Sequence, residues 1–216
     1  WHRIGLVPLL RDAMQRGTVL TGGSAGAICW FDAGHSDSWD PDSYKQTMAK
    51  AFEPAEGEDQ PTDEASVAPG GDKKAKPWSY IRCPCLGFLP GLVCPHHDKV
   101  QSNGVLRAAD FDGMLKRHPG ERGICIDHFA ALVVKGDSFS VLSLEGRPGS
   151  VLQGGAYSED QAGVPGVWQK DVAVDGTIDV QLVPPEGKLV DLLKLADSIV
   201  EDPNVLTCRA ENPDPE

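Results

Sequence analysis

The stretch that decides the fold prediction is Gly17-Thr18-Val19-Leu20-Thr21-Gly22-Gly23-Ser24-Ala25-Gly26. Its first half predicts a β-strand, the residues after the serine predict a helix, and Gly-x-Ser-x-Gly between them is typical of a nucleophile elbow. So tight a turn exposes the Ser24 hydroxyl, and we expect Gly22 and Gly26 to leave room where a Cβ would clash. The Ala25 N–H at the start of the helix would point at a developing oxyanion. The alternative interpretation is a glycine-rich turn with an incidental serine.

The rest of the chain alternates between helical and strand patterns, which predicts an α/β fold. Apolar residues recur at helical spacing in three segments: 1–16, 104–117 and 189–200. Short apolar runs bounded by turn residues predict four strands: 86–94, 123–127, 130–135 and 138–144. Gly136-Asp137 predicts a hairpin turn between the last two of these strands.

The domain organisation follows from shifts in composition. We expect an α/β domain over residues 1–155. It contains a surface insertion at about 53–77 that is rich in Glu, Asp, Pro, Gly and Lys, a composition that predicts disorder. Residues 156–216 are predicted to form a β-rich and helical C-terminal extension of the same domain.

Composition excludes several classes of function. The formal net charge of −12 argues against binding to nucleic acid or to an anionic membrane surface. No run approaches the roughly 18 apolar residues of a membrane span, and no signal peptide is visible, so the sequence predicts a cytoplasmic protein. The six cysteines are therefore expected to be reduced thiols. No pattern in the sequence indicates a cofactor or fixes the oligomeric state.

A serine nucleophile needs a base, and three histidines lie where strands are predicted to end. His96 and His97 follow one apolar strand, and His128 follows the strand 123–127. Open α/β sheets gather their active sites at the carboxyl ends of parallel strands. His118, in a Lys-Arg-His-Pro turn, is predicted to lie on the surface. A lone histidine is more often structural than catalytic, and that alternative stays open for each of these residues.

Four segments together resemble the serine peptidase family of dipeptidase E (aspartyl dipeptidase) and cyanophycinase. They occur in the family's order over about residues 1–155: Trp1-His2-Arg3 with the helix that leads into Gly17-Thr18-Val19-Leu20, Gly22–Phe31 with Asp37-Ser38, Leu86–Asp98, and Gly123–Leu132. The resemblance implies a flavodoxin-like α/β fold related to class I glutamine amidotransferases, with a mostly parallel sheet and helices on both faces. It also implies serine-type hydrolysis of short peptides, without a metal or other cofactor.

The resemblance implies a role for each part of the site. Ser24 aligns with the family's nucleophile, and His96, in the Pro-His element, aligns with its base. The N–H of Ala25 would form half of the oxyanion hole. His97 stands where the family often has an aromatic residue, so we expect it to form a wall of the pocket.

The sequence departs from the family at two places. The family has a carboxylate where His128 stands, which implies that a neutral imidazole orients the base and stabilises its imidazolium less than a carboxylate does. Asp127 or Asp98 could take the orienting role instead. The family's first strands, with the Gly-rich turn that supplies the second oxyanion donor, would lie upstream of Trp1. We therefore expect an α/β sheet that lacks its N-terminal strands.

Two other functions compete with an active peptidase. One is a pseudoenzyme that keeps the fold without turnover, which the departures from the family favour. The other is a structural zinc site, because residues that suit tetrahedral zinc lie close together in the sequence: Cys83, Cys85, Cys94 and His96. An acidic substrate side chain would need a cation, for which the nearby candidates are Arg82, Lys99 and Arg107.

Overall fold

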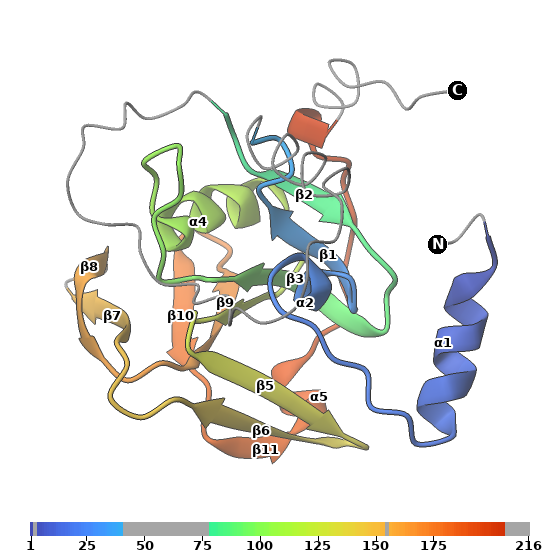
Figure 1. Ribbon diagram of the computed structural model, residues 1–216. Coiled ribbons are helices and arrows are strands. Elements are labelled where there is room, and N and C mark those ends of the chain that lie inside the picture. Colours follow the sequence, from blue (N-terminus) through green and yellow to red (C-terminus); the bar gives the residue numbers. More distant parts are fainter. Residues whose placement is uncertain (2–3, 41–77, 154–155, 206–216) are drawn as a thin grey trace, which may run out of the picture.

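A computed structural model describes residues 1, 4–40, 78–153 and 156–205 (Figure 1). The insertion predicted at 53–77 and the acidic end of the chain lie outside these residues. A six-stranded sheet forms the centre of the described part, and helices and a smaller sheet surround it. No helix in the described ranges combines the length and the apolar character needed to cross a membrane.

The central sheet is parallel in its middle and antiparallel at both edges. Its strand order is β10-β9-β4-β3-β1-β2. β1, β3 and β4 run parallel, whereas β2 pairs antiparallel with β1 and β9 antiparallel with β4. The strands are β1 (Phe31–Ser36), β2 (Ile81–Pro84), β3 (Leu89–Pro95), β4 (Gly123–Ile126), β9 (Val167–Val172) and β10 (Ile178–Leu182). The α/β fold class is confirmed, and three neighbouring parallel strands end at the same edge of the sheet.

Helices cover both faces of this sheet, and the alternation of side chains along β3 explains why. α2 (Ala25–Ile28) and α4 (Arg107–Arg117) lie on opposite faces, and α5 (Leu189–Leu192) packs on the same side as α2. α1 (Leu6–Gln15) stands apart from the sheet (Figure 1). Leu92 and Cys94 of β3 belong to the core that contains Phe111 of α4. Val93 belongs to the opposite core, with Ile28 of α2. β3 is therefore buried on both sides, as its unbroken apolar sequence requires.

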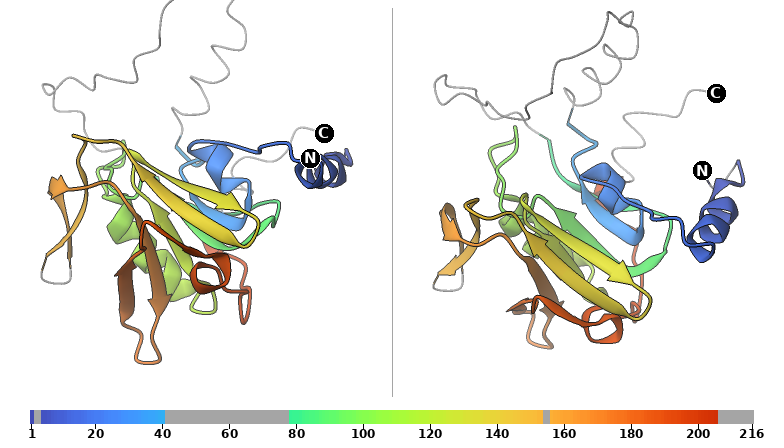
Figure 2. Two further views of the ribbon diagram at one scale, coloured as in Figure 1. Left: turned by 90° about the horizontal axis from the view of Figure 1, so that it is seen from below. Right: turned by 60° about the horizontal axis from the view of Figure 1, so that its bottom comes forward.

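A smaller antiparallel sheet shares the core that contains α2. Its order is β11-β6-β5, and its strands are β5 (Ala130–Lys135), β6 (Ser138–Ser143) and β11 (Glu186–Lys188). Gly136, at φ +64°, forms the turn between β5 and β6, as the sequence predicts. Figure 2 shows β5 and β6, in yellow, alongside the central sheet. A separate hairpin joins β7 (Gly149–Gln153) and β8 (Ala156–Gly163).

The segment before the elbow differs from its prediction. Residues 17–22 are predicted to form a strand, but no described strand pairs with them, and Val19 is 83% exposed. An extended segment becomes a strand only when a neighbour takes its backbone hydrogen bonds. Helix α1 forms as predicted and contacts the body through Arg11, which donates to the Gly87 carbonyl at 2.8 Å and stacks on Phe88.

The helix predicted over 189–200 is also shorter in the structure. α5 ends at Leu192, and Leu193 is extended, so that both side chains are buried. The chain then runs beside the loop before β4, where the Asp197 N–H donates to the Gly120 carbonyl at 3.0 Å. These tertiary contacts override the helical period of the sequence.

Candidate active site

Ser24 occupies the strained turn that a nucleophile elbow requires. Its backbone has φ 52° and ψ −121°, a conformation that residues other than glycine rarely adopt. A Cβ at Gly22 would lie 2.2 Å from the Gly26 carbonyl oxygen, so only glycine fits there. The Ala25 N–H, at the start of α2, donates to no backbone carbonyl among the described residues. The turn thus presents a serine beside an available N–H donor.

Gly26 does not have the steric role that the sequence predicts. A Cβ at this position would meet no atom within 4 Å. The reason is that Gly26 faces a hollow of about 510 Å³ beside α2, whose other lining includes Trp1, Cys29 and Leu86. Close backbone approach in the elbow therefore depends on Gly22.

His96 and His128 meet across the ends of β3 and β4. His96 is the first residue after β3, and His128 is the second after β4. Their Nδ1 atoms are 2.8 Å apart, so one ring donates and the other accepts. The parallel register, in which Pro95 lies beside Ile126, brings the two turns together. Two of the predicted site residues are therefore in direct contact.

His96 itself has an unusual backbone and an unusual pKa. Its φ is 51°, and Ser24 is the other non-glycine residue with positive φ in the described part of the chain. Burial lowers the pKa of His96 to about 4, and the neighbouring Arg107 and His128 add to the effect. The imidazole is therefore neutral at pH 7, the form that can accept a proton.

The serine and the histidine pair lie on neighbouring elements but are not joined. Ser24 begins α2, which shares a core with β1 and β3, and His96 follows β3. None of the hydrogen bonds between described residues links the Ser24 hydroxyl to His96 or to His128. Nucleophile–base bonds are often long in the absence of substrate and tighten when it binds.

His97 and Asp127 belong to a separate buried network. His97 is fully buried and does not form a pocket wall; its Nδ1 lies 2.9 Å from Ser150 Oγ and 3.4 Å from Asp127 Oδ1. Asp127 also accepts the backbone N–H groups of Ser150 and Gly166. Burial acts to raise the pKa of Asp127, but hydrogen bonds from His97 and Ser150 lower it. The oxygens of Asp127 are thus used to tie the end of β4 to other segments.

Arg107 lies near the site, but it is not a free cation for substrate. It is 1% exposed, its Nη2 donates to the His35 carbonyl at 2.6 Å, and its Nη1 lies 3.3 Å from Asp37 Oδ2. The guanidinium also stacks over the Tyr80 ring, 4.9 Å from its centre. Arg107 therefore fixes the end of β1, and its charge reaches His96.

The end of β1 is a part of the site region that sequence reasoning missed. His35 is fully buried, its Nε2 lies 2.8 Å from Asp110 Oδ1, and its ring stacks on Tyr80 at 4.0 Å. Burial lowers the pKa of His35 to about 4. A signal was present, because His35 lies at the end of a third parallel strand and Asp37 follows that strand. The residues after the serine predict a helix, which hides this strand, because α2 ends at Ile28 and β1 already begins at Phe31.

Two groups that the sequence predicts to be accessible are buried around Glu121 and Asp202. Arg82 donates Nε and Nη2 to the Glu121 carboxylate at 2.7 and 2.8 Å. His118 is 2% exposed, with Nδ1 3.8 Å from Glu121 and Nε2 4.0 Å from Asp202. The C-terminal segment around Asp202 covers this turn, which the local sequence cannot reveal. Of the three candidate cations, Lys99 stays accessible, with a side chain that is 32% exposed.

The cysteines do not assemble a zinc site. Cys83 belongs to β2 and Cys85 follows it, whereas Cys94 is buried in β3, and β1 separates these strands. His96 Nδ1 is already engaged by His128. The described ranges contain no group of three or more His, Cys, Asp or Glu side chains that could hold a metal ion.

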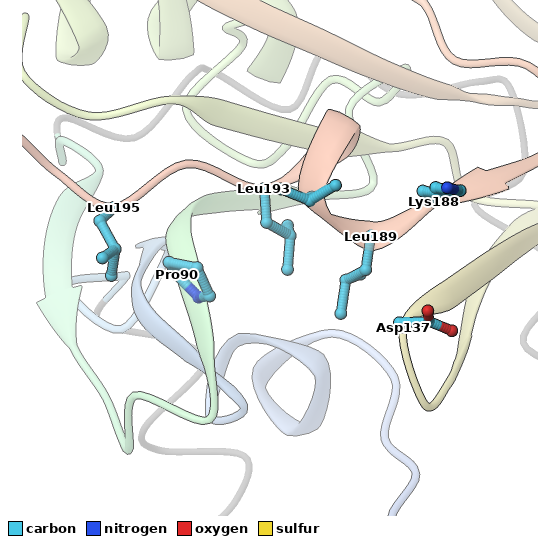
Figure 3. Close-up of a pocket in the computed structure, with 7 residues that line it drawn as sticks. Pro90, Asp137, Lys188, Leu189, Leu193 and Leu195 are labelled. Carbon is cyan, nitrogen blue, oxygen red and sulfur yellow. The ribbon is translucent and has the colours of Figure 1, made fainter.

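A second hollow, of about 500 Å³, lies away from the histidines (Figure 3). Leucines of α5 and of the segment after it line one side, and Pro90 lines the other. Asp137 and Lys188 are its charged residues. It contains none of the predicted catalytic side chains.

Comparison with known proteins identifies the family of the chain. The sequence model of Peptidase family S51 matches residues 1–142. The chain is 35% identical to G2/mitotic-specific cyclin-1 of Trypanosoma brucei brucei over 190 residues, which cover 87% of this chain and 51% of that protein. It is 33% identical to the uncharacterized peptidase YgaJ of Bacillus subtilis (strain 168) over 98 residues, 45% of this chain and 26% of that protein. The chain thus spans about half the length of the first relative and a quarter of the second. It belongs to peptidase family S51.

Proposed function

We propose that this chain is a serine peptidase that hydrolyses short peptides, with Ser24 as nucleophile, His96 as base and His128 as the group that orients the base. One observation carries the proposal. Ser24 and His96 are the two non-glycine residues with positive φ among the described residues. Such strain costs free energy and concentrates at functional sites. In this chain the strained residues are Ser24 and His96, the nucleophile and the base of the proposed reaction.

The contact between the histidines sets the protonation state that the reaction requires. If His96 Nδ1–H donates to His128 Nδ1, then His96 Nε2 is unprotonated and can accept the Ser24 hydroxyl proton. Ser24 Oγ then attacks the peptide carbonyl carbon, and the oxyanion accepts a hydrogen bond from the Ala25 N–H. His96 returns the proton to the leaving amine, and the acyl-enzyme forms. Water, deprotonated by His96, hydrolyses the ester and restores Ser24.

A second candidate function is a catalytically impaired member of the same family. It is favoured by the absence, among the described residues, of a hydrogen bond from Ser24 to His96. An imidazole at position 128 also stabilises the imidazolium of His96 less than a carboxylate would. The two candidates share the fold and differ in whether Ser24 can be acylated.

A serine-directed fluorophosphonate probe separates these candidates. In the active peptidase the probe labels Ser24, peptide mapping locates the adduct there, and Ser24→Ala abolishes both labelling and the hydrolysis of a panel of di- and tripeptides. His96→Ala should lower kcat by at least about 10³-fold, as loss of a triad member does. Circular dichroism must show that both variants are folded. Absence of labelling in the folded wild-type chain supports the impaired enzyme, and turnover by Ser24→Ala refutes the mechanism.

A further inference from the structure

The turns that carry the two histidines hold one another beyond the ends of the strands. The His97 N–H donates to the Ile126 carbonyl at 3.1 Å, which continues the parallel pairing of β3 with β4. Lys99 Nζ lies over the Phe129 ring, 5.4 Å from its centre. Phe129 in turn packs edge-on against the His128 ring, with 4.5 Å between centres. The turn after β3 therefore contacts the turn after β4 at several points.

Asp98 makes the contact that acts directly on His128. Its Oδ1 accepts the backbone N–H of His128 at 2.7 Å, and the residue is 3% exposed. A hydrogen bond from an N–H to a carboxylate is short and roughly twice as strong as a neutral one. This bond fixes the main chain of His128, and hence the point from which its imidazole reaches His96 Nδ1.

Asp127 and Asp98, the two carboxylates that the sequence offers as orienting groups, thus have different surroundings. Asp127 binds Ser150, Gly166 and His97, and so ties β4 to other segments. Asp98 binds the main chain of a residue whose ring touches His96. Loss of the Asp127 side chain would remove bonds that hold β4 to other segments. Loss of the Asp98 side chain would instead remove the bond that fixes the backbone of His128.

We propose that Asp98 is a positioning residue, which holds the imidazole of His128 against His96 through the backbone N–H of His128. The inference rests on the proposed function, in which His128 orients the base. It gives Asp98 an indirect role in place of the direct bond to the His96 ring that the sequence alone suggested.

A double-mutant cycle in the full chain tests this role. Asp98→Ala should lower kcat by about 10²-fold, the effect of misplacing a catalytic group by about 1 Å, with KM little changed. Because Asp98 acts through His128, the double variant Asp98→Ala/His128→Ala should be no slower than His128→Ala alone. Asp98→Asn keeps an oxygen acceptor and should recover most of kcat. Multiplicative losses in the double variant overturn the proposal.

Asp202 offers a matched control beside β2, the edge strand of the sheet. It is 1% exposed, and its Oδ2 accepts the backbone N–H of Arg82 at 2.9 Å, so Asp202→Ala deletes the same kind of bond. This variant should be destabilised in urea without a change in kcat under conditions where it is folded. If Asp202→Ala lowers kcat as much as Asp98→Ala does, the loss reflects general destabilisation and the proposal fails.

Nuclear magnetic resonance gives a readout that does not depend on turnover. In protein labelled with ¹⁵N-histidine, the spin coupling across the His96 Nδ1···His128 Nδ1 hydrogen bond reports the contact directly. The coupling should disappear in Asp98→Ala and persist in Asp98→Asn and Asp202→Ala. If it persists in Asp98→Ala, the proposal is wrong. If it behaves as expected while the serine probe never labels Ser24, the positioning role holds and the proposed peptidase function fails.

Discussion

Two alanine substitutions in the elbow should have opposite effects. A Cβ at Gly22 would lie 2.2 Å from the Gly26 carbonyl oxygen and 2.4 Å from its carbon, which is 1.2 and 1.0 Å inside the 3.4 Å at which ordinary contact begins. Both are backbone atoms, so no side-chain rotation relieves the overlap. The start of α2 must move, and Ser24 and Ala25 move with it. We expect Gly22→Ala to lower the free energy of unfolding by about 1–3 kcal/mol and to slow acylation of Ser24 by about 10²-fold.

Gly26→Ala is the matched control for this prediction. Nothing lies within 4 Å of its Cβ position, and its φ is outside the left-handed range. Because the residue lies in α2, alanine should raise the free energy of unfolding by about 0.5–1 kcal/mol. Urea unfolding measures the stability of each variant, and the rate of fluorophosphonate labelling measures acylation. If Gly22→Ala is neutral in both assays, or if Gly26→Ala does equal damage, close packing of the turn does not hold Ser24 in place.

Three further predictions concern ionisable groups that are buried or partly buried. Because His96 has a pKa of about 4, kcat/KM should stay constant as the pH falls to about 5 and then drop with a limb near 4; a limb near the ordinary histidine value of about 6.5 would contradict this assignment of the base. His97→Ala should lower the free energy of unfolding by about 2 kcal/mol in urea, with kcat and KM nearly unchanged, because His97 is buried against Ser150; a large rise in KM would place it in the pocket after all. Glu121→Ala should cost about 3–5 kcal/mol in the same titration, because it leaves Arg82 buried without its carboxylate, and Arg82→Met in that background should restore part of the loss.

Helices and turns whose formation depends on residues close in the sequence were predicted well. The helical spacing in residues 1–16 corresponds to α1, and the Gly136-Asp137 turn corresponds to the hairpin β5–β6. The predicted strand 123–127 corresponds to β4 with one residue fewer. Elements that depend on distant partners were predicted poorly. Residues 17–22 have strand character but no described neighbour to pair with, and residues 193–200 pack on a loop near Gly120 instead of continuing a helix.

The same distinction between local patterns and distant contacts applies to the candidate site. The sequence by itself determined the Gly-x-Ser-x-Gly elbow, the Pro-His element and the peptidase family, because these are local patterns of residue type and spacing. Only the tertiary structure decided which of the candidate orienting groups meets the His96 ring. His128, Asp127 and Asp98 were all candidates, and the parallel register of β3 and β4 brought the His128 ring to His96, whereas Asp127 binds Ser150. Residues 32 positions apart make that contact. Its geometry is set by strand pairing and by the Asp98 hydrogen bond to the backbone of His128, which no pattern within either turn encodes.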